Sequence, residues 1–294
     1  MNVKKTVALS NKPLQRTAPA RSARRWAVPR RRGLRPRLLA AVIRSRRPFG
    51  AAAERQVVRQ TTKGSMAVNA DQVQQHFRVQ VPAYTELMQR LIPHYDLQRD
   101  VMVSLMPSDR TLPLRILDLG CGTGVMASRL ADEFPSAQLT LFDLTDEMID
   151  HCKSRLGANS RVSFKVGDFR KDDFGSGYDM ILASLSLHHA TLDERPLLAE
   201  RLLRSLVPGG LLITAEVVVD ESPPVRERQY EMWRRFMASQ GEDADAWYQR
   251  HLAKDHPVEM SRWIRMLSDA GFASPGCFWR YLNFAILSSW RTTV

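Results

Sequence analysis

A glycine-rich loop that follows an acid is the part of this sequence best suited to bind a ligand. It reads Asp118-Leu119-Gly120-Cys121-Gly122-Thr123-Gly124 and joins an apolar stretch to a helix-like one. Glycine lets the backbone turn and approach a ligand without a Cβ clash, and the turn after a strand is where doubly wound sheets bind ligands. The loop therefore predicts a ligand site at the end of a strand.

Two further acids stand at the ends of the next two apolar stretches. Asp143 follows the second stretch, at the place where a carboxylate can chelate a ribose diol. Asp168 ends the third stretch. Because the carboxyl ends of parallel strands meet at one edge of a sheet, we expect both acids to face the same ligand as Asp118. The pattern favours a nucleoside.

Spacing and charge discriminate between a dinucleotide and S-adenosylmethionine. The dinucleotide fingerprint is G-x-G-x-x-G, whereas this loop reads G-x-G-x-G and has Val125 at the place of the third glycine. Asp118 would also repel an anionic pyrophosphate, while S-adenosylmethionine carries a sulfonium and an ammonium and no phosphate. We therefore expect S-adenosylmethionine.

Alternating strand-like and helix-like stretches position these acids. Predicted strands lie at 115–119, 138–143, 162–167, 178–184 and 211–219, and predicted helices at 124–134, 146–156 and 192–206. Two N-terminal helices, 71–77 and 84–106 with a break at Pro93, precede them. A helical insert at 224–240 and 243–253, a helix at 257–270 and strands at 276–281 and 284–290 follow. The pattern predicts an α/β fold with a doubly wound, mostly parallel seven-stranded sheet.

These features resemble the class I S-adenosylmethionine-dependent methyltransferases, from about Gln75 to Arg291. The resemblance is specific in Ile116 to Gly124, Phe142 to Leu144, Gly167 to Phe169, Tyr178 to His189 and Leu206 to Leu211. It implies a Rossmann-like methyltransferase fold and S-adenosyl-L-methionine as the cofactor.

The resemblance also implies roles for individual residues. Gly120, Gly122 and Gly124 would line the methionine part of the cofactor, beside Asp118 and Cys121. Asp143 would hold the ribose hydroxyls, Asp168 would bond the adenine amino group, and Leu144 and Phe169 would sandwich the ring. Ser184 and Leu185 would face the methyl group, and Tyr84 would reach the cofactor from the N-terminal helices.

Within this superfamily the layout is most similar to the carboxy-S-adenosylmethionine synthase branch, which is tied to modification of the tRNA wobble uridine. The matching pieces are Val81 to Tyr84, a helical lid insert at about 220–256, and Asp269 to Phe272 leading to Tyr281 to Phe284. That branch has an arginine for the extra carboxylate just after a phenylalanine. Here Met237 follows Phe236, and Arg234 and Arg235 precede it, which favours plain methyl transfer.

Methyl transfer is an in-line displacement at a carbon that the sulfonium already activates, so a strong base is optional. The candidate bases near strand ends are His188, His189 and Glu216, although such a histidine pair can also simply orient a loop. Trp233 and Phe236, three residues apart on a predicted helix, are candidates for lining a pocket that suits either a planar small molecule or a flipped nucleobase.

The basic charge of the chain is concentrated at its N-terminus. Residues 1–65 hold 18 Lys and Arg and one acid, whereas residues 66–294 hold 25 basic and 30 acidic residues. Three interpretations remain: an RNA- or lipid-binding arm, an organellar presequence, or an over-called start with the true one at Met66. We favour the last, with a methyltransferase domain over 66–294.

The three cysteines, Cys121, Cys152 and Cys277, are far apart, so we expect neither a disulfide scaffold nor a metal site. The apolar run at 38–43 is too short to cross a membrane, which predicts a soluble, cytoplasmic protein without a membrane partner. The leading function is a methyltransferase for a small molecule. The alternatives are a carboxy-S-adenosylmethionine synthase-like or tRNA-modifying enzyme and, as the weaker one, a nucleic-acid-binding protein that works through its basic tail. The composition leaves the oligomeric state open.

Overall fold

The computed structural model describes residues 81–293, which all belong to one compact unit of the chain. The basic segment 1–65, the start expected at Met66 and the helix expected at 71–77 lie outside the described residues. Of the entry segment, the structure gives two helices, α2 (Val81–Leu91) and α3 (Tyr95–Ser104), in place of the single interrupted helix expected there. Pro93 separates them, and His94 adopts a left-handed backbone with φ 56°.

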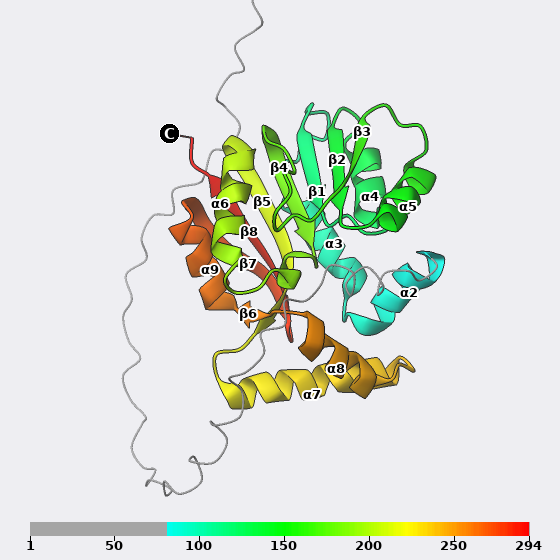
Figure 1. Cartoon of the computed structure of the whole chain (residues 1–294), viewed down its shortest axis with the longest axis vertical. Coiled ribbons are helices and arrows are strands. Elements are labelled where there is room, and N and C mark those ends of the chain that lie inside the picture. The colour runs from blue at the N-terminus through cyan, green and yellow to red at the C-terminus, as the bar shows by residue number, and fades with distance from the viewer. Residues whose placement is uncertain (1–80, 294) are drawn as a thin grey trace, which may run out of the picture. The chain divides into compact units, whose positions relative to one another are not determined.

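The centre of the molecule is a twisted sheet with strand order β3-β2-β1-β4-β5-β8-β7 (Figure 1). Its strands are β1 (Arg115–Leu119), β2 (Gln138–Asp143), β3 (Val162–Val166), β4 (Tyr178–Ser184), β5 (Leu206–Val219), β7 (Phe272–Tyr281) and β8 (Phe284–Arg291). The first five are parallel, and β8 runs antiparallel to both β5 and β7. The chain order reverses between β1 and β4, which makes their carboxyl ends the place to look for a ligand site.

The expected doubly wound sheet is confirmed, with three differences in its strands. An eighth short strand, β6 (Val258–Glu259), pairs with β5. Strand β5 begins at Leu206 and continues past the glycine turn expected before it, with a shift in its pairing to β4. Strand β7 begins at Phe272, before the predicted residue 276. Pairing with neighbouring strands decides these boundaries, and it does not show in the local sequence pattern.

Helices cover both faces of the sheet because successive strand residues point to opposite sides. Ile116, Met180 and Leu182 pack under α3, α4 (Val125–Glu133) and α5 (Asp146–Leu156). Leu117 and Ile181 pack on the other face, under α6 (Arg195–Ser205) and α9 (Met260–Asp269). The central strands β1 and β4 are thus apolar on both sides, as a covered parallel sheet requires.

The insert forms two antiparallel helices, α7 (Pro223–Ser239) and α8 (Ala244–Lys254), beyond the end of β5 (Figure 1). Two polar contacts join the insert to α2. The Trp233 indole donates a hydrogen bond to the Leu91 carbonyl at 2.7 Å, and Arg90 forms an ion pair with Glu242 at 2.6 Å. An apolar cluster that includes Trp233, Met237 and Phe284 fills the space between them. The insert and the N-terminal helices therefore cover the carboxyl end of the sheet together.

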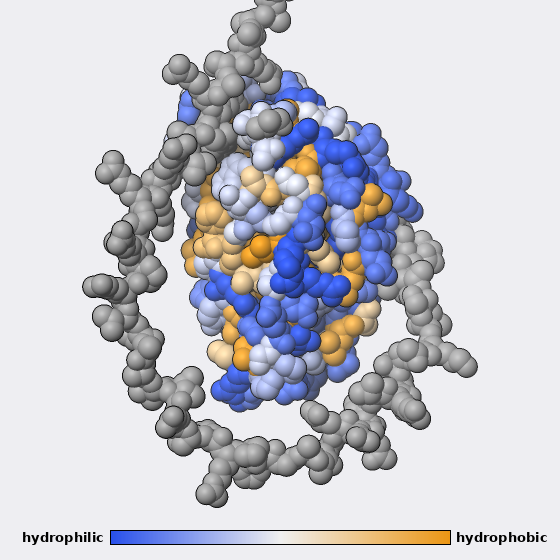
Figure 2. Space-filling model, turned by 90° about the vertical axis from the view of Figure 1, so that its left-hand side faces the viewer, coloured by the Kyte–Doolittle hydropathy of each residue, from blue (hydrophilic) through white to orange (hydrophobic). Residues whose placement is uncertain are grey.

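The surface carries no continuous apolar belt on the face in Figure 2, where hydrophilic side chains surround separate hydrophobic spots. Among the helices of residues 81–293, none is both long and apolar enough to cross a membrane.

Candidate active site

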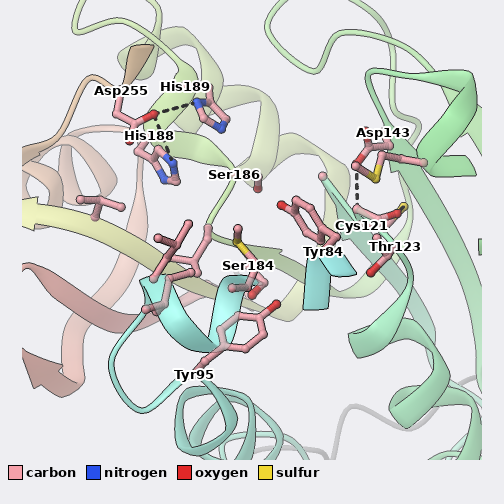
Figure 3. A pocket seen from close by; sticks show the side chains of 18 of the residues that line it. Tyr84, Tyr95, Cys121, Thr123, Asp143, Ser184, Ser186, His188, His189 and Asp255 are labelled. Carbon is pink, nitrogen blue, oxygen red and sulfur yellow. Dashed lines mark hydrogen bonds and ion pairs between the residues drawn. The ribbon is translucent and has the colours of Figure 1, made fainter. Parts of the chain in front are cut away.

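A pocket opens at the carboxyl ends of β1 and β4, between the glycine loop and the helical insert (Figure 3). Its lining includes most of the residues that the sequence singled out for a cofactor: Tyr84, Asp118, Gly120, Cys121, Gly122, Asp143, Leu144, Asp168, Phe169, Ser184 and Leu185. Gly124 is not in the lining; it starts α4 behind the loop. The fold thus brings residues from four strand ends and from α2 to one cavity.

The glycine loop has a backbone that only glycine adopts without strain. Gly120, Gly122 and Gly124 have φ of 75°, 54° and 75°. A Cβ on Gly120 would lie 2.4 Å from the Ser186 Cβ, while the Ser186 hydroxyl donates to the Leu119 carbonyl at 2.7 Å. The loop is therefore held against the start of the segment that follows β4, and its other side is left to the pocket.

Asp118 places an unpartnered carboxylate in the pocket. The side chain is 1% exposed, and neither oxygen has a hydrogen-bond partner among the described residues. Burial, helped by the charge of Asp143, raises the pKa of this carboxyl to about 7. Because an isolated buried carboxylate is costly, a cationic group of a ligand would stabilise it.

Asp143 uses part of its hydrogen-bonding capacity on the loop itself. It accepts from Gly122 N at 2.8 Å and from Thr145 N at 3.4 Å. Burial raises its pKa, and the backbone donors oppose that shift. A carboxylate has about four acceptor positions, so the side chain can shape the loop and also receive two hydroxyl groups.

Asp168 is engaged by a neighbour that the sequence did not suggest. Arg170 donates to both of its oxygens, at 2.8 Å and 2.7 Å. Burial alone would raise the pKa of Asp168, but these bonds outweigh it and lower the pKa. Because Arg170 also lines the pocket, the adenine ring of a bound cofactor would contact this ion pair and not an unpaired carboxylate.

The far end of the pocket begins where β4 stops. Leu185 has a φ of 55°, a left-handed backbone that is uncommon for a leucine. Its amide donates to the Ala215 carbonyl of β5 at 2.8 Å, which holds the turn. The turn leads into the short helix η1 (Leu187–His189). His188 and His189 therefore come soon after Leu185, which we expected to face the methyl group.

His188 and His189 meet Asp255, a partner contributed by the residue after α8 (Figure 3). The Oδ1 atom of Asp255 lies 3.4 Å from His189 Nδ1 and 3.9 Å from His188 Nε2. His251 Nδ1 contacts the other oxygen at 2.7 Å. Burial lowers the pKa of His188. Burial opposes ionisation of Asp255, yet the three histidines together hold its pKa well below the usual range.

Sequence reasoning missed Asp255 and His251 because α6, β5 and α7 separate them from the histidine pair in the chain. The backbone brings them together: the amide of His256 donates to the His188 carbonyl at 2.8 Å. The only signal in the sequence was the group of His251, Asp255 and His256 at the end of α8. The sequence did not indicate which other residues this group would contact.

The third candidate base, Glu216, lies outside the pocket lining. Successive residues of a strand face opposite sides, and Val217 takes the side toward the pocket. Glu216 instead faces α6, where the Arg195 guanidinium is 3.8 Å away and both side chains are almost fully buried. Burial raises the pKa of Glu216 to about 7.

Of the two candidate substrate residues, Trp233 lines the pocket and Phe236 does not. Phe236 packs at the edge of the apolar cluster beside it, and the fully buried Met237 takes the position next to the pocket. The spacing of three residues placed both aromatic side chains near one helix face, but neighbouring α2 and α8 decide which one reaches the cavity.

Arg234 and Arg235 also stay outside the pocket lining. Arg234 pairs with Asp245 and Arg235 with Glu231 on the outer side of the insert. Arg250 of α8, which the sequence did not single out, does line the pocket, with its guanidinium 5.0 Å from the centre of the Trp247 ring. An arginine is thus available to the cavity from α8, although the sequence analysis expected none.

Comparison with known proteins agrees with this geometry. Residues 116–210 match a family described as a methyltransferase domain. The carboxy-S-adenosyl-L-methionine synthase of Chromohalobacter salexigens is 24% identical, over 72% of this chain and 81% of the relative. The synthase of Methylococcus capsulatus is 28% identical, over 68% of this chain and 86% of the relative.

The fold is similar to that of an O-methyltransferase family protein from Burkholderia thailandensis, with a TM-score of 0.53 and 17% identity. The match covers 72% of this chain and 59% of that protein. The chain therefore spans less than two thirds of this neighbour, and the likeness concerns the fold.

Proposed function

We propose that this chain, a member of the class I S-adenosylmethionine-dependent methyltransferase superfamily, transfers the cofactor's methyl group to a small acceptor with a planar ring. The methyltransferase class and the cofactor, S-adenosyl-L-methionine, are the premises. The nature of the acceptor and the plain form of the cofactor are the proposal.

The observation that carries the proposal is the polarity of the pocket. Its cofactor end holds the unpartnered carboxylate of Asp118, which suits the ammonium and sulfonium of S-adenosylmethionine. Its other end, beyond Leu185, holds the cluster of His188, His189 and Asp255. A methyl group placed between the two ends would leave the sulfur on one side and an acceptor on the other, as in-line displacement requires.

In the transfer the acceptor's nucleophilic atom bonds to the methyl carbon, the carbon–sulfur bond breaks, and its electron pair stays on the sulfur. The protein's task is to align three atoms and to keep water out. Leu185 would lie beside the transferred methyl group, and α2 and the insert cover the cavity. The polar cluster offers hydrogen-bonding partners to the acceptor.

The shape of the acceptor follows from the aromatic lining. Trp233 and Trp247 of the insert and Phe284 of β8 contribute to the pocket wall on this side. Flat, apolar side chains stack well on a planar ring and gain little from a flexible polar chain. A small aromatic molecule therefore fits this end better than a peptide or a sugar.

A second candidate is formation and binding of a carboxylated cofactor, because the two relatives above are named carboxy-S-adenosyl-L-methionine synthases. Arg250 favours it, because a guanidinium in the pocket could meet an added carboxylate. The nearby alternatives in the sequence, Arg234 and Arg235, pair with acids elsewhere, which supports plain methyl transfer as the first choice.

Calorimetric titration of the purified chain with S-adenosylmethionine and with its carboxylated analogue separates the two candidates. We expect S-adenosylmethionine to bind at least as tightly as the analogue. Mass spectrometry of the ligand that copurifies with the chain gives an independent reading of the same preference.

Arg250→Ala is the informative variant, and Arg234→Ala combined with Arg235→Ala is its matched control outside the pocket. If the unmodified chain preferred the carboxylated cofactor by tenfold or more, and only Arg250→Ala removed that preference, plain methyl transfer would be refuted and a synthase-like activity identified.

A further inference from the structure

We infer that His188, His189 and Asp255 form a binding site for one divalent transition-metal ion at the acceptor end of the pocket. Each residue presents one ligand atom, and the three atoms lie within 4.8 Å of one another. The function of the ion rests on the proposed methyl transfer, whereas its binding does not depend on it.

The separations between the atoms fit an ion better than a set of hydrogen bonds. Asp255 Oδ1 is 3.4 Å and 3.9 Å from the two imidazole nitrogens, and 3.9 Å is beyond hydrogen-bond length. Two ligands about 2.1 Å from a zinc ion and arranged tetrahedrally are roughly 3.4 Å apart. His189 is already at that separation from Asp255 Oδ1, and a shift of about half an ångström would bring His188 to it.

The outer contacts of Asp255 hold it in the orientation that such a site needs. His251 contacts Oδ2 at 2.7 Å, which leaves Oδ1 facing His188 and His189. The Tyr230 hydroxyl in turn contacts His251 Nε2 at 3.1 Å, and both Tyr230 and His251 are buried. Partners of this kind orient metal ligands and tune their affinity.

The types of ligand atom suit a metal as well. Two imidazoles and one carboxylate form a donor set for Zn²⁺ and other first-row divalent ions, with coordination positions left for water or substrate.

The ring of His188 is buried but makes no hydrogen bond to Asp255. The residue is 5% exposed, and its Nε2 atom lies 3.9 Å from Asp255 Oδ1, too far for a hydrogen bond. An ion coordinated by both atoms would hold the ring and the carboxylate together at this separation.

An ion at this place would act on the acceptor. Its open positions face the cavity beyond Leu185, so it could bind an acceptor oxygen and favour loss of that oxygen's proton to water. The oxygen would then bond to the methyl carbon as the carbon–sulfur bond breaks. Arg250 and Lys254 line the same end and favour an acceptor that carries negative charge.

The test uses the full chain, stripped with a chelator and titrated with Zn²⁺ by calorimetry and with Co²⁺ by visible absorption. We expect one ion per chain and the absorption bands of Co²⁺ with nitrogen and oxygen ligands. Asp255→Asn and His189→Asn should each weaken Zn²⁺ binding by at least about 100-fold, and Tyr230→Phe by about tenfold.

Two variants control for binding elsewhere: His151→Gln on α5, outside the pocket, and Cys277→Ser, which removes the exposed thiol on β7. Both should bind Zn²⁺ like the unmodified chain. S-adenosylmethionine affinity, measured on every sample, reports whether the pocket is intact.

The outcomes separate the two proposals. The metal site is overturned if the chain binds S-adenosylmethionine but takes up no Zn²⁺ or Co²⁺. It is also overturned if only Cys277→Ser abolishes metal uptake. Both outcomes leave the proposed methyl transfer unaffected. A chain that binds one Zn²⁺ through Asp255 but prefers the carboxylated cofactor overturns plain methyl transfer and leaves the metal site standing.

Discussion

Asp118, the buried acid at the end of β1, is the residue whose replacement tests the electrostatic reasoning most directly. We predict that Asp118→Asn stabilises the cofactor-free protein near pH 8 and weakens cofactor binding at the same pH. The asparagine keeps the shape of the side chain and removes its charge. One substitution should therefore have opposite effects on folding and on binding.

The size of the effect follows from the pKa. Burial raises the pKa of Asp118 from the ordinary 3.8 to about 7, a change of roughly three units at about 1.4 kcal/mol each, or about 4 kcal/mol. A carboxyl whose pKa is raised on folding favours the folded state fully below its unfolded pKa. That contribution is lost as the pH rises from about 4 through about 7. A buried amide has its own cost of about 1–3 kcal/mol, so we expect a net gain of about 2 kcal/mol at pH 8 and little or none at pH 5.

Cofactor binding should respond in the opposite direction. Loss of a charged partner for the ammonium costs about 1.5–3 kcal/mol, which raises the dissociation constant for S-adenosylmethionine roughly 10- to 150-fold. The affinity of the unmodified chain should itself rise with pH as Asp118 ionises near pH 7.

The assay is urea unfolding of the cofactor-free chain at pH 5, 6.5 and 8, with calorimetric titration of the cofactor at the same values. Asp132→Asn, which removes an exposed acid of α4, is the matched control and should change neither quantity. Glu216 has a similarly raised pKa, so the comparison is between variant and unmodified chain rather than between pH values alone. An identical difference in unfolding free energy at pH 5 and pH 8 would show that Asp118 does not become ionised in the folded protein, and the argument would fail.

Two further predictions concern the glycine loop. Asp143→Ala should weaken S-adenosylmethionine binding by about 1.5–3 kcal/mol in calorimetric titration, because the bond from Gly122 N is lost together with any contact to the ribose; an unchanged circular dichroism spectrum and an unchanged affinity would remove Asp143 from the site. Gly120→Ala should lower both affinity and thermal midpoint, since its Cβ would lie 2.4 Å from the Ser186 Cβ at a φ of 75°. If affinity and thermal midpoint recover in part when Ser186→Gly is added, the clash between the two Cβ atoms is the cause. If neither recovers, strain in the backbone of residue 120 is the cause instead.

The strands and the cofactor loop were predictable because their signals are local. Strands β1, β2 and β4 have the predicted bounds, since a buried parallel strand is a short continuous run of apolar residues that needs no information from elsewhere. The glycine loop was equally readable, because its three positive φ angles exclude side chains at those positions. Proline and glycine residues also indicated most of the boundaries between helices and strands, because their effect on the backbone is local.

The strand-end acids line one pocket, whereas the partners of their carboxylates were not part of the prediction. Asp118 and Asp143 lie in the pocket as parallel topology requires, whereas the ion pair of Asp168 with Arg170 could not be foreseen. Two residues so near in sequence can meet or turn apart, and the packing of the loop after β3 decides between the two.

The acceptor end shows most clearly what only the tertiary structure decides. The sequence by itself determined a sheet, a loop and a cofactor, because each depends on the periodicity or conformational freedom of neighbouring residues. It gave equal weight to His188, His189 and Glu216, and only the alternation of β5 turned Glu216 toward Arg195 and away from the pocket. It offered no partner for the histidines, because Asp255 reaches them through the packing of the insert across the end of the sheet. Contacts between distant segments depend on how whole elements bury their apolar faces against each other, and no local pattern of residues records that outcome.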